Sequence, residues 1–147
     1  MTNYAAWKAF DGKTNAATES NTSIFTIYVK INRKIKLSSF DLTTYTNNNY
    51  LPYAMYIFAT NDGTHPTYDS SQQRYYTNLQ RTAGATITYN TGISDYYDDY
   101  LFYFLTTLGT AYTQIAELKL YGSYLDTPPD YVNAWAAPNE HKWVIKY

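Results

Sequence analysis

Two carboxylates stand where their neighbours and spacing could support chemistry. Asp11 follows an apolar pair and precedes Gly12, a pattern typical of a turn that fixes one carboxylate. Glu117 stands at the entrance of residues 116–122, whose alternation of apolar and polar side chains predicts a half-buried strand. We interpret the two segments as ends of a β-sandwich that are brought together, with a metal ion as one way of joining them.

The other titratable residues give little support for an enzyme. Asp95, Asp98 and Asp99 form an acidic cluster, and paired carboxylates cleave glycosides. Adjacent acids in one loop are more often turn formers that face solvent. His65 and His141 are the only histidines, and neither belongs to a metal-binding or triad pattern. The sequence also has no Gly-rich phosphate loop, so we expect a protein that binds rather than catalyses.

Composition narrows the class of protein. A length of 147 residues fits one domain. The net charge of -1, without clustered Lys and Arg, argues against a nucleic-acid partner. Cysteine is absent, which excludes disulfides and thiolate metal sites and leaves the redox compartment undecided. The 19 tyrosines suit strands, protein interfaces and sugar-binding surfaces alike.

Short strand-like segments recur along the chain, and no segment keeps a helical period. We expect strands at residues 24–29, 35–45, 53–59, 85–90, 100–106 and 114–121. The apolar alternation slips at residues 38–39, which predicts a β-bulge, and Asn-Asp-Gly at residues 61–63 predicts a tight turn. Residues 64–82 are polar, and we expect a surface loop or short edge pieces there. This pattern is typical of a sandwich or a barrel.

The C-terminal part differs from the rest. Residues 126–130 contain two prolines and are typical of a semi-rigid linker, and residues 131–147 form a short tail with Trp135 and Trp143. We therefore expect a sandwich over residues 1–122, followed by a linker and tail over residues 123–147. The tail either packs on its own domain or docks on a neighbouring subunit.

No targeting or membrane segment is predicted. The N-terminus lacks the basic and apolar regions of a signal peptide. No apolar run approaches the roughly 20 residues of a transmembrane helix, so we expect no membrane insertion.

Five segments in this order resemble the discoidin, or coagulation factor 5/8 type C, domain family, whose jelly-roll fold is shared by family 32 carbohydrate-binding modules. They are Ala6-Trp7-Lys8-Ala9-Phe10-Asp11-Gly12, residues 35–43, Ala59-Thr60-Asn61-Asp62-Gly63, Tyr100-Leu101-Phe102-Tyr103-Phe104 and residues 115–122. The resemblance covers about residues 4–122. It implies an all-β, discoidin-like jelly-roll β-sandwich with a short C-terminal extension.

The chain departs from the family pattern in several places. Two family tryptophans are missing, near Thr18 and Tyr68, and the arginine of the strand at residues 100–104 has no counterpart. The family's first strand is nearly absent, which leaves two alternatives open: the chain is a fragment, or a neighbour supplies that strand.

The resemblance implies a structural cation, often Ca²⁺, between the early loop and the final strand. By residue match, the ligands are side-chain oxygens of Asp11 and Glu117 and carbonyls of Lys8, Lys13, Ala16 and Ala116. Alanine lacks the hydroxyl that the family has at Ala16, and Thr14 or Thr18 could replace it. The alternative is that Asp11 caps its own turn and Glu117 is an exposed acid at a strand end. No organic cofactor is implied.

The resemblance also implies that loops at one end of the sandwich bind a sugar, with an aromatic ring against its apolar face. The candidate loops are residues 45–50, 74–76 and 96–98. The candidate ligand-binding residues are Tyr45, Asn48, Tyr50, Arg74, Tyr75, Tyr76, Tyr97 and Asp98. The alternative is that these residues form oligomer contacts, where Tyr and Arg are enriched.

We therefore expect a non-catalytic module that recognises cell-surface glycans on a virion, as part of a phage tail, surface adhesin or receptor-binding protein. The grounds are the resemblance, the missing signal peptide and cysteine, and the abundance of Tyr, Asn and Thr. One alternative is a structural virion decoration or assembly protein, whose tail contacts other virion subunits or a second copy. Another is a carbohydrate-binding module from a secreted glycoside hydrolase or adhesin, located outside the cell or at its surface.

Overall fold

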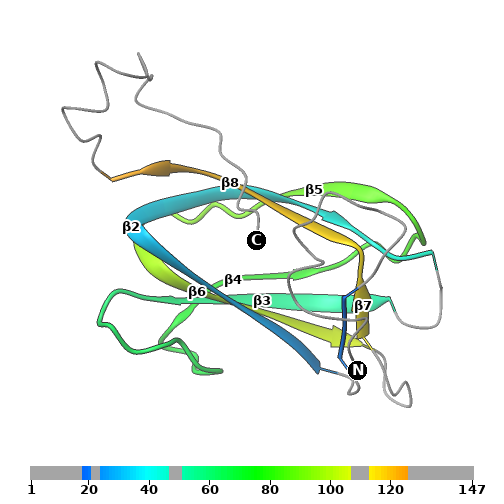
Figure 1. Ribbon diagram of the computed structural model, residues 1–147, viewed down its shortest axis with the longest axis horizontal. Helices are drawn as coiled ribbons and strands as arrows, with labels where there is room; N and C mark the ends of the chain where they lie inside the picture. Colours follow the sequence, from blue (N-terminus) through cyan, green and yellow to red (C-terminus); the bar gives the residue numbers. More distant parts are fainter. Residues whose placement is uncertain (1–17, 21–23, 47–50, 107–112, 126–147) are drawn as a thin grey trace.

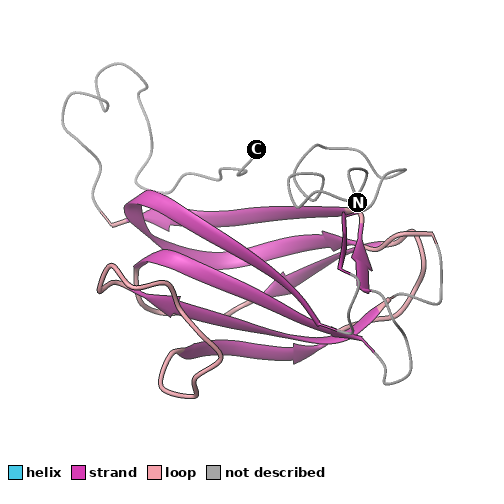
Figure 2. Ribbon diagram, turned by 60° about the horizontal axis from the view of Figure 1, so that its bottom comes forward, coloured by secondary structure: helices cyan, strands magenta, loops and turns pink. Residues whose placement is uncertain are grey.

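The computed structural model of the chain describes residues 18–20, 24–46, 51–106 and 113–125. All regular structure in these residues is β-strand (Figure 2). The strands are β1 (Thr18–Ser20), β2 (Ile24–Thr43), β3 (Pro52–Thr60), β4 (Gln73–Asn78), β5 (Thr86–Asn90), β6 (Tyr97–Thr106), β7 (Thr113–Ile115) and β8 (Glu117–Tyr124). The part of the chain that is described contains no helix long and apolar enough to cross a membrane. The all-β class predicted from the sequence is confirmed.

The strands form two layers that share β2 (Figure 1). The first half of β2 pairs with β6, and β3 and β4 follow outward from β6. The second half of β2 pairs with β5 on one side and with β8 on the other. Strands β1 and β7 make a separate two-stranded sheet. All of these pairings are antiparallel, which gives the predicted sandwich.

The core lies between the layers, because alternate residues of each strand point inward. Phe25, Ile27 and Val29 of β2 face it in the first layer, and Phe40 and Leu42 face it in the second. Ile35 and Leu37 keep the odd-numbered phase of the first half of β2. The inward phase changes only after Leu37, because the register shifts there by one extra residue. Strand β6, which contains the strand expected at residues 100–106, lies between β2 and β3 and is therefore a central strand.

The predicted bulge is present. Leu37 pairs with Gly122 and Ser39 pairs with Tyr121, so Ser38 is the extra residue of β2. Gly122 must be a glycine here, because a Cβ at this position would lie 2.4 Å from the carbonyl oxygen of Lys36. The predicted turn at residues 61–63 is also confirmed: Gly63 has a φ of 80°, and the Thr64 amide donates to Asp62 Oδ1 at 2.9 Å.

Some predicted boundaries were wrong. The two strands expected at residues 24–29 and 35–45 are one strand, β2, because the polar residues 32–34 only shift its register against β6. Residues 97–98, predicted as part of a loop, lie in β6. Residues 74–76, named as a candidate loop, lie in the edge strand β4, which agrees with the alternative of short edge pieces at residues 64–82. Strand β8 continues to Tyr124, two residues past the predicted end of the sandwich at residue 122.

Candidate functional site

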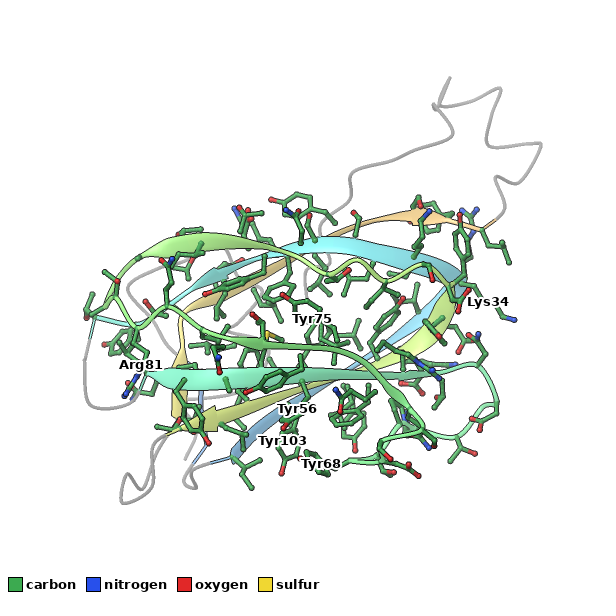
Figure 3. The ribbon with its side chains drawn as sticks, turned by 180° about the vertical axis from the view of Figure 1, so that it is seen from behind. Lys34, Tyr56, Tyr68, Tyr75, Arg81 and Tyr103 are labelled. Atoms are coloured by element: carbon green, nitrogen blue, oxygen red, sulfur yellow. The ribbon has the colours of Figure 1, made fainter. Side chains whose placement is uncertain are left out.

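The predicted ligand-binding residues lie at two opposite ends of the sandwich. Tyr45 follows the end of β2, and its carbonyl accepts from the Gly84 amide at 3.2 Å in the loop that carries Arg81. Tyr97 pairs with Ile35, next to Lys34, where β2 passes from one layer to the other. Arg81 and Lys34 mark these two ends in Figure 3. The structure therefore does not bring Tyr45 together with Tyr97, and Asn48 and Tyr50 lie outside the described residues.

The predicted ligand-binding residues 74–76 lie in β4, and neighbouring residues there point to opposite sides of the sheet. Tyr75 lies between the layers, where its ring packs edge-on against Phe40 with centroids 6.1 Å apart (Figure 3). Tyr76 points to the opposite side of the sheet and is 45% exposed. Tyr75 therefore contributes to the core, whereas Tyr76 belongs to a surface.

That surface is a tyrosine face on the outer side of the first layer, formed by Tyr28, Tyr56, Tyr68, Tyr76 and Tyr103. Strand register explains it, because Tyr56 of β3 stands directly opposite both Tyr103 of β6 and Tyr76 of β4. Side chains that are directly opposite on one face of a sheet interact.

Tyr68 joins the face from the loop at residues 61–72. Its ring centroid lies 5.3 Å from that of Tyr56, 5.2 Å from that of Phe58 and 4.9 Å from that of Tyr103. Figure 3 shows Tyr56, Tyr68 and Tyr103 gathered on one side of β3 and β6. The loop therefore folds back over the sheet and places a further ring on it.

The tyrosine face consists of exposed rings that pack on a buried phenylalanine. Phe58 beneath them is 1% exposed, whereas Tyr28 is 48% exposed and Tyr68 is 59% exposed. A hydrogen bond with Tyr68, together with partial burial, raises the pKa of Tyr56 to about 12. Tyr76 donates its hydroxyl to Asn78 Oδ1 at 3.0 Å. The face thus presents flat apolar rings with polar hydroxyl tips, of which that of Tyr76 is held by Asn78.

Paired charges border the tyrosine face. His65 Nδ1 lies 2.8 Å from Asp99 Oδ2, and the Asp99 side chain is 1% exposed. The imidazole also packs on Tyr28, with ring centroids 5.3 Å apart. Lys30 Nζ lies 3.1 Å from Asp98 Oδ1. His65 itself is exposed in the loop after β3, and the register of β6 with β3 places its buried partner Asp99 within reach.

A cavity of about 450 Å³ opens at the end of the sandwich where β3 ends and β4 and β6 begin. It is lined by Thr60, Asn61, Asp62, Ser71, Gln72, Arg74 and Tyr97, so it includes two of the predicted ligand-binding residues. Asn61 fixes the cavity wall, because its amide donates to the Tyr96 carbonyl at 2.7 Å and accepts from the Asp98 amide at 3.0 Å.

The predicted metal ligands are described only in part. Glu117 is 3% exposed at the start of β8, so the alternative of an exposed strand-end acid is wrong. The Ala116 amide donates to the Thr43 carbonyl at 2.9 Å, which holds this segment against β2. Asp11, Lys8, Lys13 and Ala16 lie outside the described residues. Within the ranges that are described, no three His, Cys, Asp or Glu side chains cluster as metal ligands.

Comparison with solved structures defines the class of fold. The F5/8 type C domain of a Bacteroides fragilis protein is 16% identical, with a TM-score of 0.61 and 81% of each chain covered. The C-terminal domain of a B. fragilis chitobiase is also 16% identical, with a TM-score of 0.64 and 83% of each chain covered. The chain therefore has the fold of F5/8 type C domains, as predicted.

The same fold occurs in family 32 carbohydrate-binding modules. The module of NanJ from Clostridium perfringens, solved in complex with galactose, is 19% identical, with a TM-score of 0.64, and the match covers 82% of this chain and 86% of that one. No family model and no curated protein matches the sequence. At these identities the comparisons establish the fold, and function has to be argued from the residues.

Proposed function

We propose that the chain is a non-catalytic carbohydrate-binding module and that the tyrosine face is its sugar-binding surface. The observation that carries the proposal is the group of exposed, mutually packed tyrosine rings on the outer side of the first layer. The electron-rich face of an aromatic ring attracts the weakly positive C–H groups on the apolar side of a pyranose. The phenol hydroxyls around the rings can bond the sugar hydroxyls.

The composition of the surface favours a sugar over an aliphatic partner. Among the large apolar side chains of the described residues that are exposed, four are tyrosines and the others are Ile24 and Leu125. A tyrosine ring has one apolar surface and one polar tip, and so does a sugar ring. At the border Lys30 is paired with Asp98 and His65 lies against Asp99, so the polar groups there already have partners within the protein.

The acids of this region are unsuited to glycoside cleavage. That reaction needs two carboxyl groups that both reach one glycosidic bond. Asp98 is paired with Lys30, and the buried Asp99 is paired with His65. Asp95 is exposed in the loop before β6. These positions support binding without catalysis.

A glycan array with the purified chain tests the proposal, followed by titration calorimetry on the glycans that bind. We expect Tyr68→Ala to weaken binding by more than about tenfold, a loss typical of an interface residue that carries much of the affinity. Tyr96→Ala is the matched control, because its ring packs under Lys36 instead of on the tyrosine face. A folded chain that retains no glycan would sink the proposal.

The wider context is proposed as well. We keep the virion location and the virion partners as proposals that rest on the composition, and mass spectrometry of purified particles would test them. The same tyrosine face would suit a protein contact, because Tyr is enriched at interfaces. Silence on the array together with self-association that Tyr68→Ala abolishes would favour an assembly protein.

We also propose a structural Ca²⁺, supported by the resemblance and by the burial of Glu117. Ca²⁺ prefers carboxylate and carbonyl oxygens, which is the donor set that the resemblance implies. A bound cation stabilises only the folded state, so a chelator should lower the melting temperature. The Glu117→Gln variant should melt at the same temperature with and without chelator. A wild-type melting temperature that ignores both chelator and added Ca²⁺ would exclude the ion.

A further inference from the structure

The cavity at the end of the sandwich contains a cation, Arg74, that forms no salt bridge with a carboxylate of the described residues. Arg74 lines it, and no carboxylate of the described residues lies within 4.0 Å of its guanidinium nitrogens. The nearby acids have other partners: Lys30 pairs with Asp98, and His65 pairs with Asp99. Arg74 therefore makes no salt bridge with the described residues, although the Asp62 carboxylate also lines the cavity.

A bulge in the sheet directs Arg74 to this place. Ile57 pairs with Tyr75 and Phe58 pairs with Gln73, so Arg74 is the extra residue of β4. Bulges turn a side chain away from the direction that regular alternation would give it, and they are frequent beside binding sites.

The guanidinium is held in one orientation. Its Nε and Nη2 both donate to the Ala59 carbonyl, at 3.1 and 3.0 Å. Its carbon lies 4.6 Å from the centroid of the Tyr97 ring. These contacts use two of the five N–H groups and leave the other three for a ligand. A side chain that is already ordered loses little further entropy when it binds.

The remaining wall of the cavity is polar and uncharged except for Asp62. The Asp62 carboxylate accepts from the Thr64 amide and so is part of its own turn. Gln72 accepts from the Thr67 amide at 2.9 Å, which leaves its NH₂ group as a donor. The cavity thus offers donors around a fixed positive charge, together with one acid that an anion would have to avoid.

We propose that this cavity is a second ligand site, separate from the tyrosine face, and that it binds the carboxylate of an acidic sugar such as a uronic acid unit. A planar guanidinium matches a carboxylate through two parallel hydrogen bonds. The cavity volume and its amide and hydroxyl lining suit a ring with hydroxyl groups attached. That the anion is a sugar rests on the proposed function.

Titration calorimetry on the full chain tests this, with tri-galacturonate, a neutral galactose trisaccharide and inorganic sulfate as probes. We expect tri-galacturonate to bind about tenfold more tightly than the neutral trisaccharide, and we expect this preference to shrink with added salt. Arg74→Gln should remove the preference. Arg74→Lys should keep only part of it, because the charge remains and the planar fork is lost.

The Asp62→Asn variant provides a test in which the expected result is a gain of affinity. Asparagine can still accept from the Thr64 amide, so the turn is kept and only a negative charge is removed. We expect the affinity for tri-galacturonate to rise several-fold. An unchanged or lower affinity would overturn the proposal even if Arg74→Gln failed to fold.

The outcomes separate this site from the tyrosine face. If neutral trisaccharides bind and depend on Tyr68, but Arg74→Gln changes no preference, the acidic-sugar site is wrong and the proposed function stands. If sulfate alone binds as tightly as tri-galacturonate, the cavity recognises any oxyanion and the sugar assignment is wrong. If tri-galacturonate binding depends on Arg74 and Asp62 but not on Tyr68, the two sites are independent, as proposed.

Discussion

The two outer faces of the sandwich are built in opposite ways. On the second layer, formed by β5, β2 and β8, Asp41 accepts from the Thr88 hydroxyl at 2.6 Å and from the Tyr121 hydroxyl at 2.9 Å. On the same face, the hydroxyl groups of Thr43 and Thr86 form a hydrogen bond of 2.7 Å. We call this the polar face. Its side chains use their hydrogen-bonding groups on one another.

The tyrosine face on the first layer has rings where the polar face has hydroxyls and a carboxylate. Its residues contact one another ring to ring, and Tyr28, Tyr68 and Tyr76 stay about half exposed. Tyr68 of the loop at residues 61–72 packs on Phe58, Tyr56 and Tyr103, but its own ring stays 59% exposed. The difference indicates that the polar groups of the polar face already bond one another, whereas the tyrosine face has exposed apolar area that a partner could cover.

The largest expected difference between the faces is in stability. Phe58→Ala should lower the free energy of unfolding by about 3–5 kcal/mol, because it removes a buried ring and leaves a cavity under the tyrosines. Thr88→Val, the control on the polar face, removes one exposed hydrogen bond and should cost no more than about 1.5 kcal/mol. Urea denaturation of both variants measures the difference, and equal losses would contradict it.

Alkaline pH should weaken the fold through tyrosines on both faces. A hydrogen bond with Tyr68 raises the pKa of Tyr56 to about 12, and burial raises the pKa of Tyr103 and of the core residue Tyr100. On the polar face, burial raises the pKa of Tyr121, with help from Asp41. A folded-state pKa above the unfolded value of about 10 means that the protonated phenol stabilises the native state.

The sign follows from that shift. The contribution to stability is fully present below about pH 10 and is lost as the pH rises through about 12. We expect the melting temperature to fall over this range, while absorbance at about 295 nm reports phenolate formation. Tyr100 donates to the Ile35 carbonyl at 2.7 Å and should ionise only on unfolding. Full ionisation of all tyrosines in a still-folded chain would refute this.

The sequence predicted the elements of the fold well where local chemistry decides them. The turn at residues 61–63 needed a glycine with positive φ, and the bulge at residues 38–39 appeared as a slip in alternation. Strand β4 was predicted only as one of two alternatives, a surface loop or short edge pieces, because its residues are mostly polar and only Tyr75 packs against the core. Its strand conformation comes from pairing with β3, which is a tertiary effect.

The candidate sites could be predicted only in part, because they depend on which strands pair. Tyr56, Tyr68 and Tyr103 come from three segments, and only the register of β3 with β6 brings them together. The sequence analysis expected strands at residues 53–59 and 100–106. Nothing in these stretches indicated that a loop with its own tyrosine packs on their outer side. Arg74 was identified as a candidate, but the bulge that directs it was not.

On the polar face, removing one hydroxyl should have a modest effect on stability. Tyr121→Phe deletes the hydrogen bond to Asp41 and should cost about 0.5–1.5 kcal/mol, since the acceptor is part-buried and keeps the Thr88 hydroxyl. Urea denaturation gives the free energy. Glycan affinity should stay the same in this variant. A clear loss of affinity would mean that the glycan binds the polar face, which would contradict the proposal.

Removing one hydroxyl from the tyrosine face should instead lower glycan affinity and leave the free energy of unfolding nearly unchanged. Tyr56→Phe keeps the ring but removes the hydroxyl that bonds Tyr68, so the Tyr68 ring becomes less well oriented. We expect glycan affinity to fall by about threefold, which corresponds to a hydrogen bond of roughly 0.7 kcal/mol, with little change in the free energy of unfolding. Titration calorimetry on Tyr56→Phe and Tyr121→Phe with one glycan makes the comparison. If both variants lose affinity equally, or neither does, the hydroxyl of Tyr56 does not organise a binding surface, and the rings of the tyrosine face are packing alone.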